Sequence, residues 1–280
     1  MESILELTLF AAFAAFAFKG GRNCEMPTPS LSGQRLYATD LAYIHHAGFG
    51  DFARRAAPEL IRILRAHGIR NGLIVEAGCG SGILARRLTD AGYDVFGFDQ
   101  SAAMIRLARR HAPAARFRVA SLTHVSIPPC RAVLATGEIV TYVPGGVPAF
   151  FRRVHAALQP RGLFIFDFIE SARRRTYPSK TLHGDGWSLV ARADLSASGR
   201  ILTRRLAMLR RIGHRHRRSR ETHRVRIYGK EEMAQALADA GFAVRMRRSY
   251  GRYRLLPGSV AVIAGKRAVP SQTRGRALSR

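Results

Sequence analysis

The apolar positions of this chain switch repeatedly between helical and strand spacing. Residues 51–67 carry apolar side chains at helical spacing and end at Gly68, where a helix is expected to stop. Further helices are predicted over residues 83–90, 100–110 and 147–158, and strands over residues 73–77, 93–98, 116–119, 131–135 and 163–168. This alternation favours an α/β fold with a doubly wound, mostly parallel sheet. The unbroken apolar run at 163–168 is typical of a central parallel strand.

The period changes after residue 170. Strand-like alternation with Ser-Gly and Gly-His turns covers residues 187–193, 200–211 and 220–228. We expect an antiparallel β insertion at about residues 171–228, over one edge of the sheet. Helical spacing returns at residues 230–240, before the last helix ends at Gly241, and two final strands follow at residues 242–247 and 259–265. One domain is therefore predicted over residues 31–266, with a loose basic tail at 267–280.

Residues 1–30 are predicted to be an N-terminal extension. The apolar stretch at residues 4–18 is shorter than the roughly 20 residues that span a bilayer as a helix. Acidic Glu2 and Glu6 stand where a signal peptide would carry positive charge. Met26 precedes a proline-rich segment and is a candidate initiator, in which case residues 1–25 are absent from the working protein. A helix on a membrane surface is the alternative, which we do not favour.

Composition narrows the class of protein. The 280 residues include only three cysteines, too few and too scattered for a disulfide framework, which favours a cytoplasmic protein. The net charge of +27 would attract polyanions such as nucleic acid. Nearly all the basic residues are arginines, however, a bias that GC-rich coding produces without a ligand. Much of the charge falls in residues 200–228, so a nucleic-acid partner stays open but is not favoured.

A glycine-rich turn follows the first predicted strand. Gly78, Gly80 and Gly82 form a G-x-G-x-G pattern that opens a helix, which is typical of a loop that holds a nucleotide-like cofactor. The dinucleotide pattern G-x-G-x-x-G fails here, because Ile83 stands where its last glycine belongs. Asp99 ends the second strand, 21 positions after Gly78, where a carboxylate would accept both hydroxyls of a ribose.

With Glu76 in front, the turn forms E-x-G-x-G-x-G, which resembles the first motif of the class I S-adenosylmethionine (SAM)-dependent methyltransferases. The segment from Asp99 to Ala108, D-x-S-x-x-M-x-x-x-A, is similar to the pattern that follows in that family. The resemblance covers about residues 35–266 and implies a seven-stranded Rossmann-like sheet and SAM as cofactor. It implies an enzyme that carries its acceptor-binding lid in the insertion.

The resemblance also implies a set of cofactor-binding residues. The glycines of the turn would bind the methionine portion, Asp99 the ribose and Met104 the adenine, while Glu76 would fix the loop. The segment at 120–122 lacks the acid that many relatives use for adenine, so Ser121 or backbone would replace it. The full predicted set is Glu76, Gly78, Cys79, Gly80, Gly82, Asp99, Gln100, Met104, Ser121, Leu122, Gly137 and Glu138.

Methyl transfer is an in-line displacement that depends on positioning and on a closed, aromatic site. Glu138 follows the fourth strand, on the side where open sheets bind ligands, and is a candidate base. Tyr142 is a second candidate for a catalytic role. Tyr37, Tyr43 and Trp187 are predicted to contact the acceptor.

Several rival sites are excluded. The segment at 136–139 is not the Asn/Asp-Pro-Pro-aromatic motif of amino-methylating nucleic-acid enzymes, and Cys130 precedes its strand, unlike the nucleophile of cytosine-C5 enzymes. His214, His216 and His223 lie among arginines without a carboxylate pair, so we expect solvated strand faces and no metal site. Phe168 is expected in the core.

Three functions remain. The leading one is methylation of an oxygen or nitrogen of a small molecule, the second is methylation of RNA through the arginine-rich insertion, and the third is a non-catalytic cofactor-binding scaffold. The sequence identifies neither the acceptor nor the oligomeric state.

Overall fold

The computed structural model describes residues 36–143, 146–170 and 176–266. The predictions for residues 1–30, including the initiator Met26, and for the tail at 267–280 lie outside these residues. Within the described part of the chain, no helix is both long and apolar enough to cross a membrane.

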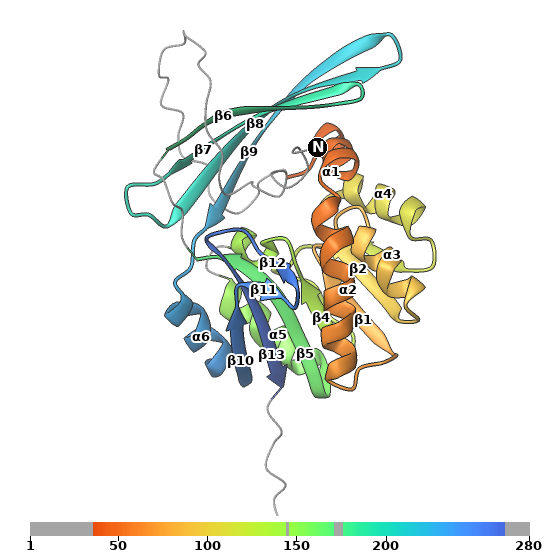
Figure 1. Cartoon of the computed structure of the whole chain (residues 1–280), viewed down its shortest axis with the longest axis vertical. Coiled ribbons are helices and arrows are strands. Elements are labelled where there is room, and N and C mark those ends of the chain that lie inside the picture. The colour runs from red at the N-terminus through yellow and green to blue at the C-terminus, as the bar shows by residue number, and fades with distance from the viewer. Residues whose placement is uncertain (1–35, 144–145, 171–175, 267–280) are drawn as a thin grey trace, which may run out of the picture.

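A seven-stranded sheet forms the centre of the fold, as predicted (Figure 1). Its strand order is β10-β13-β5-β4-β1-β2-β3, with β1 to β5 parallel and β13 antiparallel to both of its neighbours. The strands are β1 (Leu73–Ala77), β2 (Asp94–Asp99), β3 (Arg116–Val119), β4 (Cys130–Ala135), β5 (Leu158–Ile169), β10 (Phe242–Arg247) and β13 (Ser259–Lys266).

Helices cover both faces of this sheet because its strands are apolar on both sides. Successive residues of β1 belong to different cores: Val75 packs with α5 (Val147–Ala157) and α6 (Lys230–Asp239), whereas Ile74 packs with α2 (Asp51–Ala66) and α3 (Ile83–Asp90). Helix α4 (Ala102–His111) lies beside β2 and β3. Phe168 is fully buried, as predicted, and Cys130 is buried at the start of β4.

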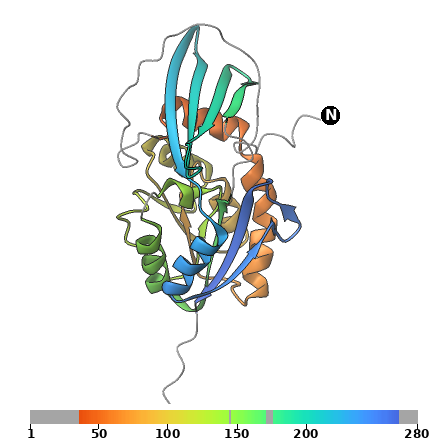
Figure 2. The same cartoon turned by 90° about the vertical axis from the view of Figure 1, so that its left-hand side faces the viewer.

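The predicted insertion is a separate antiparallel sheet that stands beyond the central sheet (Figures 1 and 2). It runs in the order β6-β7-β8-β9, with β6 (Thr176–Gly184), β7 (Trp187–Leu195), β8 (Ile201–Ile212) and β9 (Arg215–Arg226). Helix α1 (Thr39–Gly48) lies between it and the rest of the protein, and Leu41 and Ile44 pack there against Leu189 and Leu206.

Some elements differ from the sequence-based predictions. Strand β5 begins at Leu158 and not at residue 163, because the exposed segment 159–161 forms an irregularity against β4, after which the strand continues. Strand β9 begins at Arg215, five residues before the predicted start. Strand β6, helix α1, the short helix η1 (Ile139–Tyr142) and the hairpin β11 (Ser249–Tyr250)–β12 (Tyr253–Arg254) were not predicted.

Candidate cofactor and acceptor site

The glycine-rich turn has a backbone that glycine adopts readily and other residues adopt rarely. Gly78, Gly80 and Gly82 have φ angles of 67°, 51° and 79°. The amides of Gly78 and Cys79 both donate to the carbonyl of Phe98, at 2.8 and 3.0 Å. These bonds hold the turn against the end of β2, so the loop and Asp99 share one edge of the sheet.

Asp99 is half-buried at the end of β2, beside the glycine-rich turn. It accepts hydrogen bonds from the amides of Gly80 at 3.1 Å and Ser101 at 2.8 Å. Burial nevertheless raises the pKa of Asp99 to about 6. The Ser101 hydroxyl accepts from the amide of Met104, as the predicted helix cap requires, and donates to the carbonyl of Tyr37 at 2.6 Å.

Glu76 lies beneath the turn and is 5% exposed. Burial, with a further contribution from Asp99, raises the pKa of Glu76 to about 8. Its Oε2 atom has no hydrogen-bond partner among the described residues. A buried acceptor of this kind costs free energy unless a ligand or water donates to it, so it marks a place for a donor group.

A second turn with an unusual backbone conformation follows β4. Gly137 and Glu138 have φ angles of 86° and 65°, and the left-handed region is uncommon for a residue such as glutamate. Asp167 holds both amides at 2.8 Å and also accepts from the hydroxyl of Tyr250 at 2.7 Å. Burial raises the pKa of Asp167 to about 6. Strained backbone fixed in this way is typical of ligand sites.

The side chain of Glu138 is bound by the insertion. Arg204 of β8 donates to Glu138 Oε2 at 2.8 Å, and the side chains are 5% and 14% exposed. Although burial acts to lower it, the nearby Glu138 and Tyr142 hold the pKa of Arg204 above its ordinary value. Arg204 also donates to the Tyr142 hydroxyl at 3.3 Å.

His223 corrects one prediction. It is not on a solvated strand face but is 1% exposed, because it lies on the face of β9 that is turned toward α1 and the cavity. Its neighbours there include Glu221 and Tyr142. His214 and His216 are exposed, as expected. The described residues contain no group of side chains suited to a metal ion.

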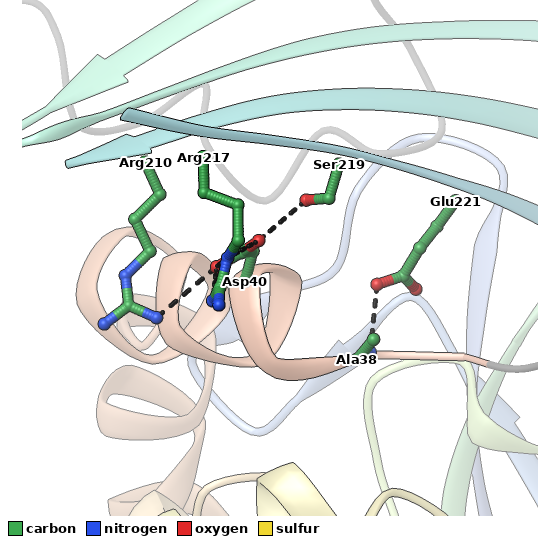
Figure 3. Close-up of polar contacts among 6 residues, drawn as sticks. All are labelled: Ala38, Asp40, Arg210, Arg217, Ser219 and Glu221. Atoms are coloured by element: carbon green, nitrogen blue, oxygen red, sulfur yellow. Dashed lines mark hydrogen bonds and ion pairs between the residues drawn. The ribbon is translucent and has the colours of Figure 1, made fainter. Parts of the chain in front are cut away.

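Helix α1 is fastened to the inserted sheet by polar contacts (Figure 3). Asp40, 4% exposed, accepts from Arg217 Nε at 2.8 Å, from the Ser219 hydroxyl at 2.9 Å and from Arg210 at 3.5 Å. Glu221 accepts from the amide of Ala38 at 2.9 Å. These contacts position α1 as a roof over the glycine-rich turn.

A cavity of about 1180 Å³, part of it open to solvent, lies between the turn and this roof. Of the sixteen positions predicted from sequence, those lining it are Tyr37, Glu76, Gly78, Cys79, Gly80, Asp99, Met104, Gly137, Glu138 and Tyr142. The structure thus brings together residues from β1, β2, β4 and the N-terminal segment at the carboxyl ends of the parallel strands.

The other predicted positions lie elsewhere. Gly82 packs against Ala108, and a Cβ atom there would come within 3.0 Å of the Ala108 Cα atom. Gln100 is exposed, Ser121 bonds the Thr123 hydroxyl, and Leu122 joins the core.

The two remaining acceptor candidates belong to the contact between α1 and the inserted sheet. Tyr43 stacks with the Arg210 guanidinium at 3.7 Å, and Trp187 packs against Phe49. Neither side chain is among the cavity-lining residues.

Several lining residues were missed. His45, Phe49 and Phe52 come from α1 and the start of α2, whereas Arg204 and Asp167 come from β8 and β5. The side chains of Tyr253, Leu255 and Leu256 come from the unpredicted hairpin and the loop after it. For these residues the sequence offered one signal, which is the acidic Asp167 inside the apolar run at 163–168.

Comparison with known proteins agrees with this geometry. Residues 74–162 match the family described as "Methyltransferase domain". The chain is 25% identical over 229 residues, 78% of this chain and 87% of the relative, to a dTDP-3-amino-3,6-dideoxy-alpha-D-glucopyranose N,N-dimethyltransferase of Streptomyces fradiae.

Two solved structures share the fold. The sugar N-methyltransferase KedS8 of Streptoalloteichus sp has a TM-score of 0.69 at 17% identity, covering 91% of this chain and 100% of the other. SAM-bound CalS10, an amino pentose methyltransferase of Micromonospora echinaspora, has a TM-score of 0.62 at 19% identity, covering 78% and 96%.

Proposed function

Because the chain is a class I SAM-dependent methyltransferase with SAM as its cofactor, we propose that it methylates the amino nitrogen of a nucleotide-linked amino sugar. The curated relative from Streptomyces fradiae carries such a substrate in its name, and two structural neighbours are named as methyltransferases of sugars. The acceptor class and nitrogen as the methylated atom are our inference for this chain.

The single observation that carries the proposal is the roofed cavity. The cavity is covered by α1 and by Arg204 of the inserted sheet, and a partly enclosed site of this kind suits a small acceptor. The turn and Asp99 occupy one part of the lining, and Arg204, Glu138 and Tyr142 supply polar groups in another. An acceptor there would meet apolar walls with a few fixed polar groups, which suits a sugar ring that carries an amine.

The cavity also explains what the protein contributes to the reaction. SAM supplies the methyl group on a sulfonium. The chain's own residues exclude water and align the acceptor nitrogen behind the methyl carbon, which accelerates a displacement mainly through positioning. We propose that Asp99 binds the ribose hydroxyls, since its two oxygens already face the turn through the amides of Gly80 and Ser101.

The test is a methylation assay with SAM and dTDP-linked 3-amino and 4-amino sugars, with product mass as the readout. A gain of one or two methyl groups on the amino sugar supports the proposal. A protein that binds S-adenosylhomocysteine (SAH) in calorimetry but methylates none of these amines refutes the acceptor class. A protein that shows no SAH binding in calorimetry would refute the cofactor site itself.

RNA methylation is the second candidate, favoured by the outer face of the inserted sheet. Arg205, Arg218 and Arg220 are exposed there, opposite the face that contacts α1. An RNA substrate predicts affinity that falls steeply as salt rises. RNA binding that is weak and insensitive to salt would exclude this candidate.

A further inference from the structure

A chain of polar side chains connects the inserted sheet to the cavity. Arg204 and His223 are direct cross-strand partners in β8 and β9, and Glu221 lies two residues before His223 on the same face. Tyr142 comes from η1, lines the cavity and contacts both Arg204 and His223. The sequence gives no hint of this grouping, because its members lie up to 81 positions apart.

Glu221 fixes the orientation of His223. Its carboxylate accepts from the amides of Tyr37 at 2.7 Å and Ala38 at 2.9 Å, the second contact being visible in Figure 3. The same carboxylate lies 2.9 Å from His223 Nε2. Because an ionised carboxylate only accepts, Nε2 must carry the imidazole proton. The other nitrogen, Nδ1, is then an acceptor, and it lies 3.4 Å from the Tyr142 hydroxyl.

The Tyr142 hydroxyl lies between His223 and Arg204. Arg204 places a permanent positive charge 3.3 Å from the hydroxyl oxygen. Burial first, and then Tyr142 itself, raise the pKa of Tyr37 well above its ordinary value, so Tyr37 stays protonated and can donate to Tyr142. By contrast, Glu138 is engaged in its ion pair with Arg204, which weakens it as a base.

We propose that Glu221, His223 and Tyr142 form a proton relay in which Tyr142 accepts the proton of the acceptor amine and His223 receives the proton of Tyr142. The relay rests on the proposed function, because it needs an acceptor that loses a proton. Tyr142 would be the catalytic base, while His223 and Glu221 act through it as positioning residues.

The reaction balances as follows. The lone pair of the amine nitrogen forms the bond to the methyl carbon as the carbon–sulfur bond breaks, and that electron pair stays on sulfur, giving neutral SAH. As that bond forms, one N–H proton passes from the nitrogen to the Tyr142 oxygen and the Tyr142 proton moves to His223 Nδ1. Glu221 stabilises the imidazolium, which returns its proton through Tyr142 to the cavity once the products have left.

The groups around His223 are compatible with this role. Tyr37 and His45 face it from the N-terminal segment, Tyr142 from η1, and Arg204 and Glu221 from the inserted sheet. Burial lowers the pKa of His45 to about 4, so this neighbour is neutral at pH 7 and adds no positive charge.

Kinetics of His223→Gln, Tyr142→Phe and the double variant test the relay. Because base catalysis is typically worth 10²–10⁴-fold, we expect His223→Gln to lower kcat by about 100-fold without changing SAH affinity. The double variant should be no slower than Tyr142→Phe, since His223 acts only through Tyr142. His216→Gln, an exposed change on the same strand, is the matched control. Two results would overturn the relay. One is a double variant whose loss of kcat is the product of the two single losses, and the other is a kcat for His223→Gln near that of the wild type.

Nitrogen NMR of the wild-type SAH complex provides a test that needs no acceptor and no variant. The relay requires the His223 proton on Nε2, with Nδ1 accepting from Tyr142. A proton on Nδ1 would overturn the relay even if the enzyme methylates amino sugars. A proton on Nε2 in an enzyme that methylates no amine would support the hydrogen-bond arrangement while the acceptor assignment fails.

Discussion

Replacing Gly82 by alanine is expected to cost stability, whereas replacing Gly80 by alanine is expected to cost cofactor affinity. Both glycines have positive φ angles, 79° and 51°, so alanine at either position meets the same left-handed backbone strain of about 1 to 2 kcal/mol. Their surroundings differ. The two variants therefore form a matched pair within one turn.

The difference can be worked from the space beside each residue. A Cβ atom at Gly82 would lie 3.0 Å from the Cα atom and 3.1 Å from the Cβ atom of Ala108. Neither atom belongs to a flexible side chain that could rotate out of the way. Overpacking adds about 1 to 3 kcal/mol, for a total of about 2 to 5 kcal/mol. A Cβ atom at Gly80 would meet no other part of the protein within 4 Å and would enter the cavity, in the space that we propose for SAM.

Urea unfolding without ligand, followed by calorimetry with SAH, separates these effects. The unfolding free energy of Gly82→Ala should fall below that of Gly80→Ala by about 1 to 3 kcal/mol. SAH affinity should fall by about tenfold or more, about 1.4 kcal/mol, for Gly80→Ala. Equal stabilities, or an unchanged SAH affinity in Gly80→Ala, would refute the assignment of Gly82 to helix packing and Gly80 to the cofactor.

Three further predictions concern buried charge. His45 has a pKa of about 4 in the folded protein and an ordinary value of 6.5, so the unfolded chain binds more protons between these pH values. Stability should therefore fall by up to about 3 kcal/mol as the pH drops from 6.5 to about 4. Urea unfolding of His45→Gln should lack this pH dependence. The effect of Asp99 on stability has the opposite sign, because its pKa is raised from 3.8 to about 6, and stability should decrease as the pH rises between these values. Urea unfolding of Asp99→Asn should lack this loss, and calorimetry of the variant should show weaker SAH binding. Arg204→Met leaves Glu138 without its buried partner and should cost about 3 to 5 kcal/mol in urea unfolding, with partial recovery when Glu138→Gln is added.

The central fold could be predicted because its signals are local. The strand before Gly78, the helix after Gly82 and the acid at Asp99 are each determined by neighbouring residues, and the structure has them within a residue or two of the predicted bounds. The cap of α4 at Ser101 is another local feature. Contacts of this kind depend on spacing along the chain and little else.

The roof of the cavity could not be predicted for the opposite reason. Strand β9 is polar on both faces, so its pattern does not reveal which side chains turn inward. His223 is buried because Tyr142 and Tyr37 contact it from distant parts of the chain. Trp187 and Tyr43 carry the expected residue types, but they pack where α1 meets the inserted sheet.

The polar contacts between α1 and the inserted sheet join segments that the ribosome makes at very different times. Asp40 and Arg210 are 170 positions apart, and Tyr37 and Glu221 are 184 apart. At 5–20 residues per second, the ribosome needs about 10 to 35 s after making α1 to deliver its partners. The nascent helix must wait with Leu41 and Ile44 uncovered, a condition in which chaperones bind apolar segments. Competence for methyl transfer is therefore acquired only after the inserted sheet has been synthesised.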